Sequence, residues 1–402
     1  HKRIKVEVKE NECPCCNHKL IKNGNKKVII QDIELHLNNT EYELESKRCS
    51  NSECNYTYSS SLPIEIEGQE FGTELRTFVP LFHYNCGLSQ DQLYNLLTEL
   101  GLKISVGSIN NFIQDAGRKC IDYYNQILDY LLSPFNAINI DETGWKTNGI
   151  PKFLYNLCNQ FASYYIICEK RNSKVVNQLL FQGKWEENGT DQVAQVYLIH
   201  DDHSSYSAKK VVTIGHQLCW THELRHYKKL TPSELIFERN EGQRVLKELQ
   251  NLYKSIKEYR KRNLLKGYVA EESAIIEQHF DEVVSQEVVW CSLFKQLKLT
   301  RNKKEKLLFC LNHPEVEPHN NRAEQKIRPC VVIRKKNHGT RSVEGEKNFC
   351  AAKSLLETLK TLNLNVYEGF SKALQGSLEL RALLPPLGGI TTFGWIKKDQ
   401  IE

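Results

Sequence analysis

The stretch Ile138-Asn139-Ile140-Asp141-Glu142-Thr143-Gly144-Trp145 carries the strongest fold signal in the chain. It opens within a short run, 137–140, that is typical of a buried strand, and Asp141 follows this run directly. A second run, 195–200, has the same character and is followed by Asp201. A lone aspartate after a strand is most often a turn residue. Two aspartates that follow buried strands can also meet at one edge of a sheet, where ions and substrates can reach their carboxylates.

The segments around these runs predict an α/β fold with a mixed sheet. They are rich in β-branched and aromatic residues with turn residues between them, and the first three follow one another in meander order. We expect strands over 137–140, 153–158, 164–168, 195–200 and 213–218, and a helix over 174–180. The first and fourth strands can be neighbours in such a sheet. Glu142 and Asp202 could also bind a metal ion, but they are second choices after Asp141 and Asp201. Strand alternation points the side chain of each to the opposite face from its neighbouring aspartate.

A third acid, Glu324, lies on a predicted helix that begins near Asn320, a plausible N-cap. Asn320 and Asn321 fall one helical turn before Glu324 and Arg328 falls one turn after it, so these side chains share a face. Such a face suits a metal and phosphate site, and it equally suits a solvated surface. Paired magnesium ions need hard oxygen ligands drawn from separate elements of a rigid scaffold, as Asp141, Asp201 and Glu324 would be.

Five ordered motifs resemble the transposases of the insertion sequence 66 family. The resemblance covers nearly the whole chain in the same order. The matching pieces are Asp141-Glu142-Thr143-Gly144-Trp145 with Asn148-Gly149, His200-Asp201 with Tyr206, Cys219-Trp220-Thr221-His222-Glu223-Leu224-Arg225, Asn320-Asn321-Arg322-Ala323-Glu324 with Arg328-Pro329, and Ile333-Arg334-Lys335-Lys336-Asn337 followed by Ser342-Val343-Glu344-Gly345.

This resemblance implies an RNase H-like catalytic core with a helical insertion and an Asp-Asp-Glu triad of Asp141, Asp201 and Glu324. The triad would hold two Mg²⁺ or Mn²⁺ ions for metal-dependent cleavage of DNA and strand transfer. His222 and Arg225 would orient the scissile phosphate or pack under the site. Cys219 and His222 alone do not favour zinc, because no second Cys/His pair follows at close spacing.

The resemblance also implies double-stranded DNA as the partner, both the terminal inverted repeats of an element and a target. A homodimer or higher oligomer would assemble on paired ends, with accessory proteins of the element as possible partners. Among the basic clusters, Arg334, Lys335 and Lys336 are the ones expected near the active site, because they closely follow Glu324.

Cysteines in the first 64 residues predict a zinc ribbon. Cys13 and Cys16 precede two strand-like runs, and Cys49 and Cys54 follow them, so four thiolates can surround one structural Zn²⁺. Cys15 lies inside the first pair and suits the loop better than the metal. Unligated buried thiols are the weaker alternative. The resemblance implies that this segment helps to bind DNA.

Residues 65–134 predict a helical region that can be a helix-turn-helix. Two helices precede a turn that contains Gly101, and a third helix would begin near Ser108. Asn110, Asn111 and Gln114 are the side chains on that helix able to contact adenine edges. A three-helix structural bundle fits the sequence equally well, and the family resemblance favours DNA binding.

Length and charge agree with several domains and a nucleic-acid partner. The 402 residues carry a net charge of +5, which allows DNA binding without requiring it. No apolar stretch reaches the length of a membrane span, so we expect a cytoplasmic protein that is nucleoid-associated when bound to DNA. The expected domains are 1–64 (zinc ribbon), 65–134 (helical DNA-binding region), 135–225 (first part of the core), 226–316 (helical insertion) and 317–402 (second part of the core and C-terminal helices).

Two other functions use the same features. An RNase H-like nuclease or resolvase would use the same carboxylates without strand transfer. A non-catalytic DNA-binding protein derived from a transposase would keep the cysteine-rich and helical modules without needing the three acids.

Overall fold

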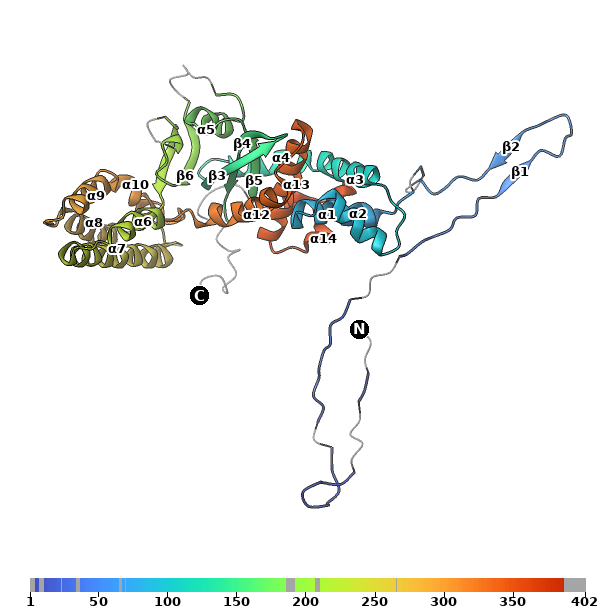
Figure 1. The fold of residues 1–402 in the computed structure, drawn as a ribbon, viewed down its shortest axis with the longest axis horizontal. Coiled ribbons are helices and arrows are strands. Elements are labelled where there is room, and N and C mark those ends of the chain that lie inside the picture. The colour runs from blue at the N-terminus through green and yellow to red at the C-terminus, as the bar shows by residue number, and fades with distance from the viewer. Residues whose placement is uncertain are drawn as a thin grey trace.

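A five-stranded mixed sheet lies at the centre of the computed structural model (Figure 1). Its strand order is β5-β4-β3-β6-β7; β3, β4 and β5 are antiparallel neighbours, and β6 and β7 continue the sheet in parallel with β3. The structure describes residues 4–6, 11–22, 24–33, 37–64, 67–68, 70–185, 192–206, 210–264 and 266–386. The strands are β3 (Ala137–Thr147), β4 (Ile150–Cys158), β5 (Ser163–Cys168), β6 (Ala194–His200) and β7 (Thr213–Leu218).

The predicted strands are confirmed, and β3 is longer than predicted. It continues seven residues past Ile140, because Asn148 and Gly149 form a tight turn that returns the chain into β4. Both turn residues have positive φ angles, 48° and 81°, as the common two-residue hairpin turns require. Asp141 was expected at a strand end, and it lies instead inside β3, just past the part that pairs with β6.

Two long C-terminal helices cover the antiparallel half of the sheet. α12 (Asn321–Asn337) packs on β3 and β4, whereas α13 (Val343–Thr361) packs along β5. The backbone N–H groups of Ser163 and Tyr165 in β5 donate to the hydroxyls of Thr358 and Ser354 in α13. α13 therefore satisfies polar groups that would otherwise remain open at the edge of the sheet.

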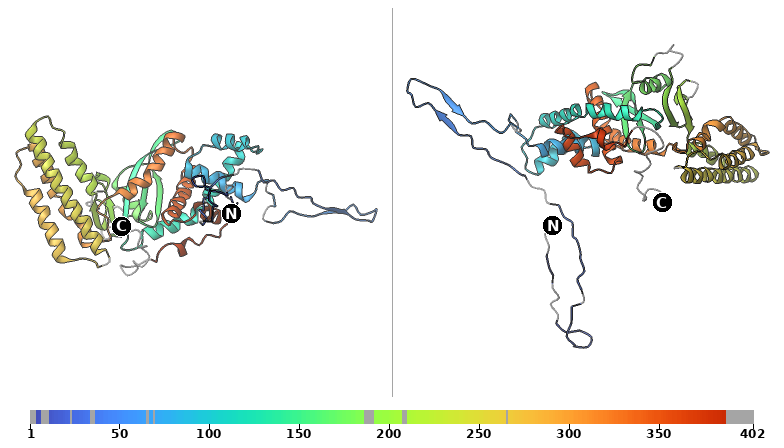
Figure 2. Two further views of the ribbon diagram at one scale, coloured as in Figure 1. Left: turned by 90° about the horizontal axis from the view of Figure 1, so that it is seen from below. Right: turned by 180° about the vertical axis from the view of Figure 1, so that it is seen from behind.

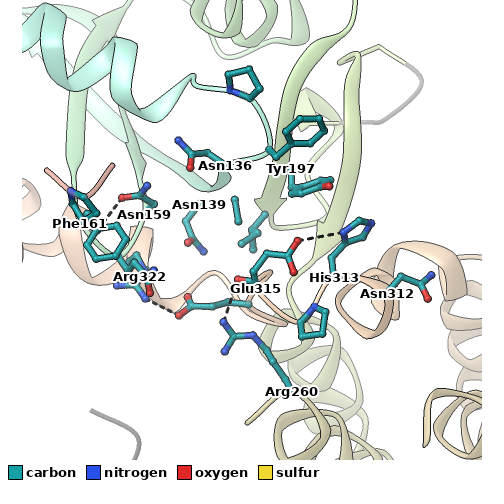
Figure 3. A pocket seen from close by; sticks show the side chains of 18 of the residues that line it. Asn136, Asn139, Asn159, Phe161, Tyr197, Arg260, Asn312, His313, Glu315 and Arg322 are labelled. Carbon is teal, nitrogen blue, oxygen red and sulfur yellow. Dashed lines mark hydrogen bonds and ion pairs between the residues drawn. The ribbon is translucent and has the colours of Figure 1, made fainter. Parts of the chain in front are cut away.

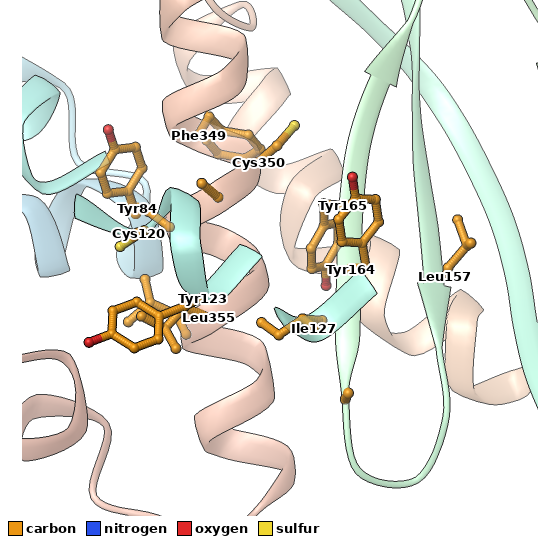
Figure 4. Packing of buried hydrophobic residues seen from close by; sticks show 14 of the residues in the cluster. Tyr84, Cys120, Tyr123, Ile127, Leu157, Tyr164, Tyr165, Phe349, Cys350 and Leu355 are labelled. Carbon is orange, nitrogen blue, oxygen red and sulfur yellow. The ribbon is translucent and has the colours of Figure 1, made fainter. Parts of the chain in front are cut away.

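Four helices precede the sheet and share its main core. They are α1 (Thr73–Cys86), α2 (Gln90–Glu99), α3 (Val106–Lys119) and α4 (Ile121–Leu131). α3 begins two residues earlier than predicted, because the Ser105 hydroxyl accepts the N–H of Ser108 and caps it. Figure 4 shows how α3, α4, α13 and β5 meet through buried residues such as Cys120, Ile127 and Leu355. Gly117 is required at the α3–α13 crossing, since a Cβ there would lie 2.3 Å from Cβ of Asn348.

A helical lobe is inserted between β7 and α12 and has its own core. Buried residues of α7, α8 and α9, including Leu249, Phe280 and Leu293, form that core together with Trp220 and Tyr227 of α6. The views in Figures 1 and 2 agree that this lobe lies at one end of the sheet. Its helices are α6 (Trp220–Leu230), α7 (Ile236–Asn263), α8 (Ala270–Ser285), α9 (Cys291–Arg301), α10 (Lys304–Leu307) and α11 (Phe309–Asn312).

The remaining described elements are short. β1 (Ser46–Arg48) and β2 (Thr57–Ser59) form a hairpin, α5 (Ser173–Leu180) follows β5, and α14 (Val366–Leu374) and α15 (Leu380–Leu383) follow α13. Among the described helices, none is long and apolar enough to cross a membrane.

Candidate active site

Asp141 lies on β3, and Asp201 directly follows the last residue of the neighbouring parallel strand β6. Asn139 pairs with Ile199, and each aspartate lies two residues beyond this pair along the chain. Because the two strands are parallel, both aspartates lie at the same end of the β3–β6 pair. Adjacent strands are about 4.8 Å apart, so the two carboxylates can share one cation.

Each aspartate is held by one backbone hydrogen bond. Oδ1 of Asp141 accepts the N–H of Glu142 at 2.9 Å, and Oδ1 of Asp201 accepts the N–H of His203 at 3.1 Å. Burial, together with the carboxylates of Asp201 and Glu324, raises the pKa of Asp141 from 3.8 to about 6 against the effect of the Glu142 N–H. The three acids are therefore close enough to repel one another, as expected of a donor set for a divalent cation.

Asn320 fixes the helix that carries Glu324 against β3. Its side-chain amide donates to the carbonyl oxygen of Ile140 at 2.7 Å and accepts from Nδ2 of Asn139 at 3.1 Å. Asn320 is 1% exposed, so these bonds are shielded from water. Glu324 follows in the first turn of α12, and the residue before Asp141 is thereby joined to the N-terminus of the Glu324 helix.

Glu324 is surrounded by Cys219, His222 and Arg225 at the start of α6. Arg225 Nη2 lies 3.3 Å from Glu324 Oε2, and His222 Nδ1 lies 3.6 Å from Glu324 Oε1. These last two atoms are buried without a hydrogen-bond partner among the described residues. Cys219, His222 and Glu324 each bring one donor atom to within 4.8 Å of the others.

Cys219 also joins the helices on the two sides of the site. Its sulfur accepts the N–H of Asn320 at 3.1 Å and lies 2.9 Å from the hydroxyl of Thr221. Burial opposes ionisation of the thiol, but hydrogen bonds from His222, Thr221 and Asn320 lower its pKa. Hydrogen bonding with Cys219 in turn raises the pKa of His222.

Glu142 and Asp202, the second choices as ligands, are both engaged elsewhere. The Glu142 carboxylate is buried and forms an ion pair with Arg171, after β5. Asp202 pairs with Lys303 of the helical lobe at 2.7 Å. Burial raises the pKa of Glu142 to about 8, and Asp141 and Asp201 add to this effect against the Arg171 guanidinium.

The other predicted supporting residues take different positions. Asn321 accepts a long hydrogen bond of 3.4 Å from Thr221, whereas Arg328 is exposed on α12. Arg334 is tied to β3, where it donates to the hydroxyl of Thr143 and to the carbonyl of Gly144. Lys335 and Lys336 are exposed at the end of the same helix.

The three side chains of α3 that were predicted to contact bases differ in whether they already form hydrogen bonds within the protein. Asn110 accepts from Nε2 of Gln90 at 2.9 Å, and the amide oxygen of Gln114 accepts from Asn348 at 2.6 Å. Asn111 is exposed and faces away from these contacts. In this structure Asn111 is therefore the one of the three that is available to a partner without breaking a bond.

The four predicted zinc ligands are not assembled in this structure. Cys13 and Cys16 lie in one turn and Cys49 and Cys54 in another, and the two hairpins point in different directions (Figures 1 and 2). Within the described residues, no three of these cysteines come close enough to share an ion. The described part of this segment is almost entirely exposed, so it has no core of its own to hold the two turns together.

A cavity between the sheet and the helical lobe does not include the three acids. It encloses about 540 Å³ between the sheet and the helical lobe, and Asn139, Tyr197, Arg260, Glu315 and Arg322 are among its lining residues (Figure 3). Its two arginines are already engaged within the protein: Arg260 donates to the carbonyls of Val316 and Glu315, and Arg322 pairs with Glu317 at 2.6 Å. We assign this cavity to the packing of the lobe against the sheet.

Comparison with known proteins identifies the family of this chain. The model of the family described as Transposase IS66 family matches residues 68–348. The chain belongs to this family. None of the curated proteins compared with the chain matches it.

The matched residues of this IS66 family member run from just before α1 into the start of α13 and so include all three acids. Two residues of the site, Asn139 and Lys303, were not singled out from the sequence, and Cys219 was considered there only as a zinc ligand. Asn139 could have been identified from the sequence, because it is a polar residue inside an otherwise apolar strand. Lys303 could not, since it lies in one of several basic clusters and only the fold brings it to Asp202.

Proposed function

We propose that this chain is a DNA transposase whose RNase H-like core cleaves element ends and joins them to target DNA through Asp141, Asp201 and Glu324. One observation carries the proposal: Asp141 and Asp201 each lie two residues beyond the paired residues Asn139 and Ile199 of two parallel strands, and the Glu324 helix is joined by Asn320 to the residue before Asp141. The strand order β5-β4-β3-β6-β7, in which the first strand of the sheet is central, supports an RNase H-like core.

The residues present fit a pair of Mg²⁺ or Mn²⁺ ions. Asp141 and Asp201 would hold one ion between them, and Glu324 would complete the second site. Bound ions would supply Lewis-acid activation of water, of a DNA hydroxyl and of the scissile phosphate. No serine, cysteine or tyrosine is required as a nucleophile. The exposed guanidinium of Arg225 and the exposed Lys335 and Lys336 would position the DNA backbone beside the carboxylates.

A cleavage assay tests this function. We expect the purified protein to cut a DNA fragment that carries the ends of its element when Mg²⁺ or Mn²⁺ is present, and to leave it intact when Ca²⁺ replaces them. Cutting that is independent of the terminal sequence, or that persists in EDTA, would contradict the proposal.

His222 is expected to act on Glu324 through one ring nitrogen. Nε2 of His222 lies 2.8 Å from the Arg225 guanidinium, which can only donate, so Nε2 carries the lone pair and the proton lies on Nδ1, toward Glu324 and Cys219. An asparagine can place an N–H near the Nδ1 position and a glutamine cannot. His222→Asn is therefore expected to retain about tenfold more cleavage activity than His222→Gln. Equal rates for the two variants, measured at equal thermal stability, would argue against this role.

The cysteine-rich segment is proposed to bind one structural Zn²⁺ through Cys13, Cys16, Cys49 and Cys54 and to assist DNA binding. The Cys13–His18 turn supports this: the N–H groups of Cys15 and Cys16 and the Cys16 thiol hydrogen-bond to the Cys13 sulfur and lower its pKa. We expect Cys13→Ser to lose the bound zinc and Cys15→Ser to keep it. Zinc content measured by mass spectrometry on the two purified variants shows whether Cys13 and Cys15 are zinc ligands.

A further inference from the structure

Lys303 of the helical lobe lies between two carboxylates of the catalytic core. It stands in the turn between α9 and α10, where the lobe returns toward the sheet. Its ammonium nitrogen is 2.7 Å from Oδ2 of Asp202 and 3.0 Å from Oε2 of Glu223. One lysine thus binds the end of β6 and the helix α6 together.

Both carboxylates immediately follow residues of the candidate active site. Asp202 follows Asp201, and Glu223 follows His222. Asp201 lies one residue beyond the end of β6, so strand pairing does not hold it. Its position depends on the short turn after the strand, which is fixed by the His203 N–H on Asp201 and by Lys303 on Asp202.

Glu223 gives the lysine a second, buried attachment. Its side chain is 3% exposed and also accepts hydrogen bonds from Thr300 at 2.6 Å and Gln296 at 3.1 Å, both on α9. A buried carboxylate needs an opposite charge, and Lys303 is the cation that contacts it among the described residues. Removing that charge would disturb the start of α6, where His222 and Cys219 meet Glu324.

We propose that Lys303 is a positioning residue that holds Asp201 and the His222 helix at the spacing the metal ions require, so that the helical lobe is part of the active site. This inference rests on the proposed metal-dependent function. Lys303 touches neither the DNA nor the metal ions in this scheme. It acts through Asp202 and Glu223.

The test measures Mn²⁺ binding directly, by electron paramagnetic resonance of free Mn²⁺, on the full chain without DNA. Lys303→Met keeps an unbranched side chain one atom shorter and removes its charge, and we expect it to weaken Mn²⁺ binding by about tenfold, the usual effect of losing a group that orients metal ligands. Lys304→Met is the matched control. Lys304 is the next residue and forms an ion pair of the same length, 2.7 Å, with Asp281 inside the lobe. We expect Lys304→Met to bind Mn²⁺ as the wild type does.

Two further variants keep the proposal testable if Lys303→Met unfolds. Lys303→Arg retains a cation and should recover most of the Mn²⁺ affinity. Asp202→Asn removes the exposed half of the contact and leaves the buried Lys303–Glu223 pair intact, so it should fold and still bind Mn²⁺ more weakly than the wild type. Wild-type affinity in Asp202→Asn, or an equal loss in Lys304→Met, would overturn the proposal.

The same titration separates this inference from the proposed function. If Asp141→Asn binds Mn²⁺ as tightly as the wild type, the metal site itself is wrong. If Asp141→Asn loses binding and Lys303→Met does not, the metal site stands and only the role of Lys303 is refuted.

Discussion

Asp141→Asn is expected to reduce DNA cleavage by on the order of a thousandfold or more while leaving binding to the element ends unchanged. The amide is nearly the same size as the carboxylate, and its oxygen can still accept the N–H of Glu142. What it removes is the negative charge that a divalent cation needs. Cleavage rates and gel-shift affinities measured on the same preparation show whether the two properties separate.

The stability of this variant gives a second readout. Burial and the neighbouring carboxylates raise the pKa of Asp141 from 3.8 to about 6, so the folded state favours the protonated form and loses stability as the pH rises through this interval. Asp141→Asn removes that penalty, and at pH 7 it should be at least as stable as the wild type. Asp115→Asn, on the surface of α3 where Asp115 pairs with Lys119, is the control expected to keep full activity. Full cleavage by Asp141→Asn would refute the assignment of the triad.

Glu357→Gln is expected to destabilise the fold by about 3–5 kcal/mol. Lys353 on α13 is completely buried, and its ammonium lies 3.0 Å from Oε1 of Glu357. The same carboxylate also pairs with Lys360 at 2.7 Å and with Lys326 of α12 at 3.3 Å. Removing the charge of Glu357 leaves Lys353 buried without a counter-charge. Urea unfolding followed by circular dichroism measures the loss.

A glutamate on the same helix provides the control. Glu344 pairs with Arg118 on the surface, with side chains 60% and 57% exposed, so Glu344→Gln should cost less than about 1 kcal/mol. Similar losses for the two variants would contradict the role given to the buried pair.

The Glu357 network also predicts a pH dependence. Burial opposes ionisation, but the ammonium groups of Lys353 and Lys360 outweigh it and lower the pKa of Glu357 from 4.5 to about 2. A carboxyl group with a lowered pKa adds stability above its unfolded pKa and loses it as the pH falls toward its folded pKa. The difference in unfolding free energy between wild type and Glu357→Gln should therefore shrink as the pH falls from about 4.5 to about 2. A constant difference over this interval would argue against the network.

The positions of the strands along the chain were accessible from the sequence, as was the possibility that the strands leading to Asp141 and Asp201 are neighbours. Each strand of the sheet has a local signature of β-branched and aromatic residues, and the meander followed by a helix limits which strands can be neighbours. The full length of β3 was not predictable from the sequence, because several residues after Asp141 are polar and owe their extended conformation to pairing with β4. The start of α3 was predicted two residues too late, because Ser105 caps the helix and the prediction placed its start near Ser108.

Contacts between distant residues explain most of what the sequence did not predict. Asn320 was chosen for its place before Glu324, but its bonds to Ile140 and Asn139 span 180 residues or more and have no local signature. The ion pairs of Lys303 with Asp202 and of Glu142 with Arg171 are of the same kind. Gln114 was chosen for its chemistry on an apparently free helix face, and α13 covers that part of the face. Such pairings depend on the packed fold, so they follow from the structure and not from residue type.

The most direct test of transposase function is a joining reaction with the purified protein, DNA carrying both ends of its element, Mg²⁺ and a supercoiled target plasmid. We predict that the element ends are cut and become covalently joined to the plasmid, that joining requires the divalent ion, and that Asp141→Asn, Asp201→Asn and Glu324→Gln each abolish it. Ends that are cut and never joined would show a nuclease instead of a transposase. Joining that survives loss of all three carboxylates would contradict the proposed active site.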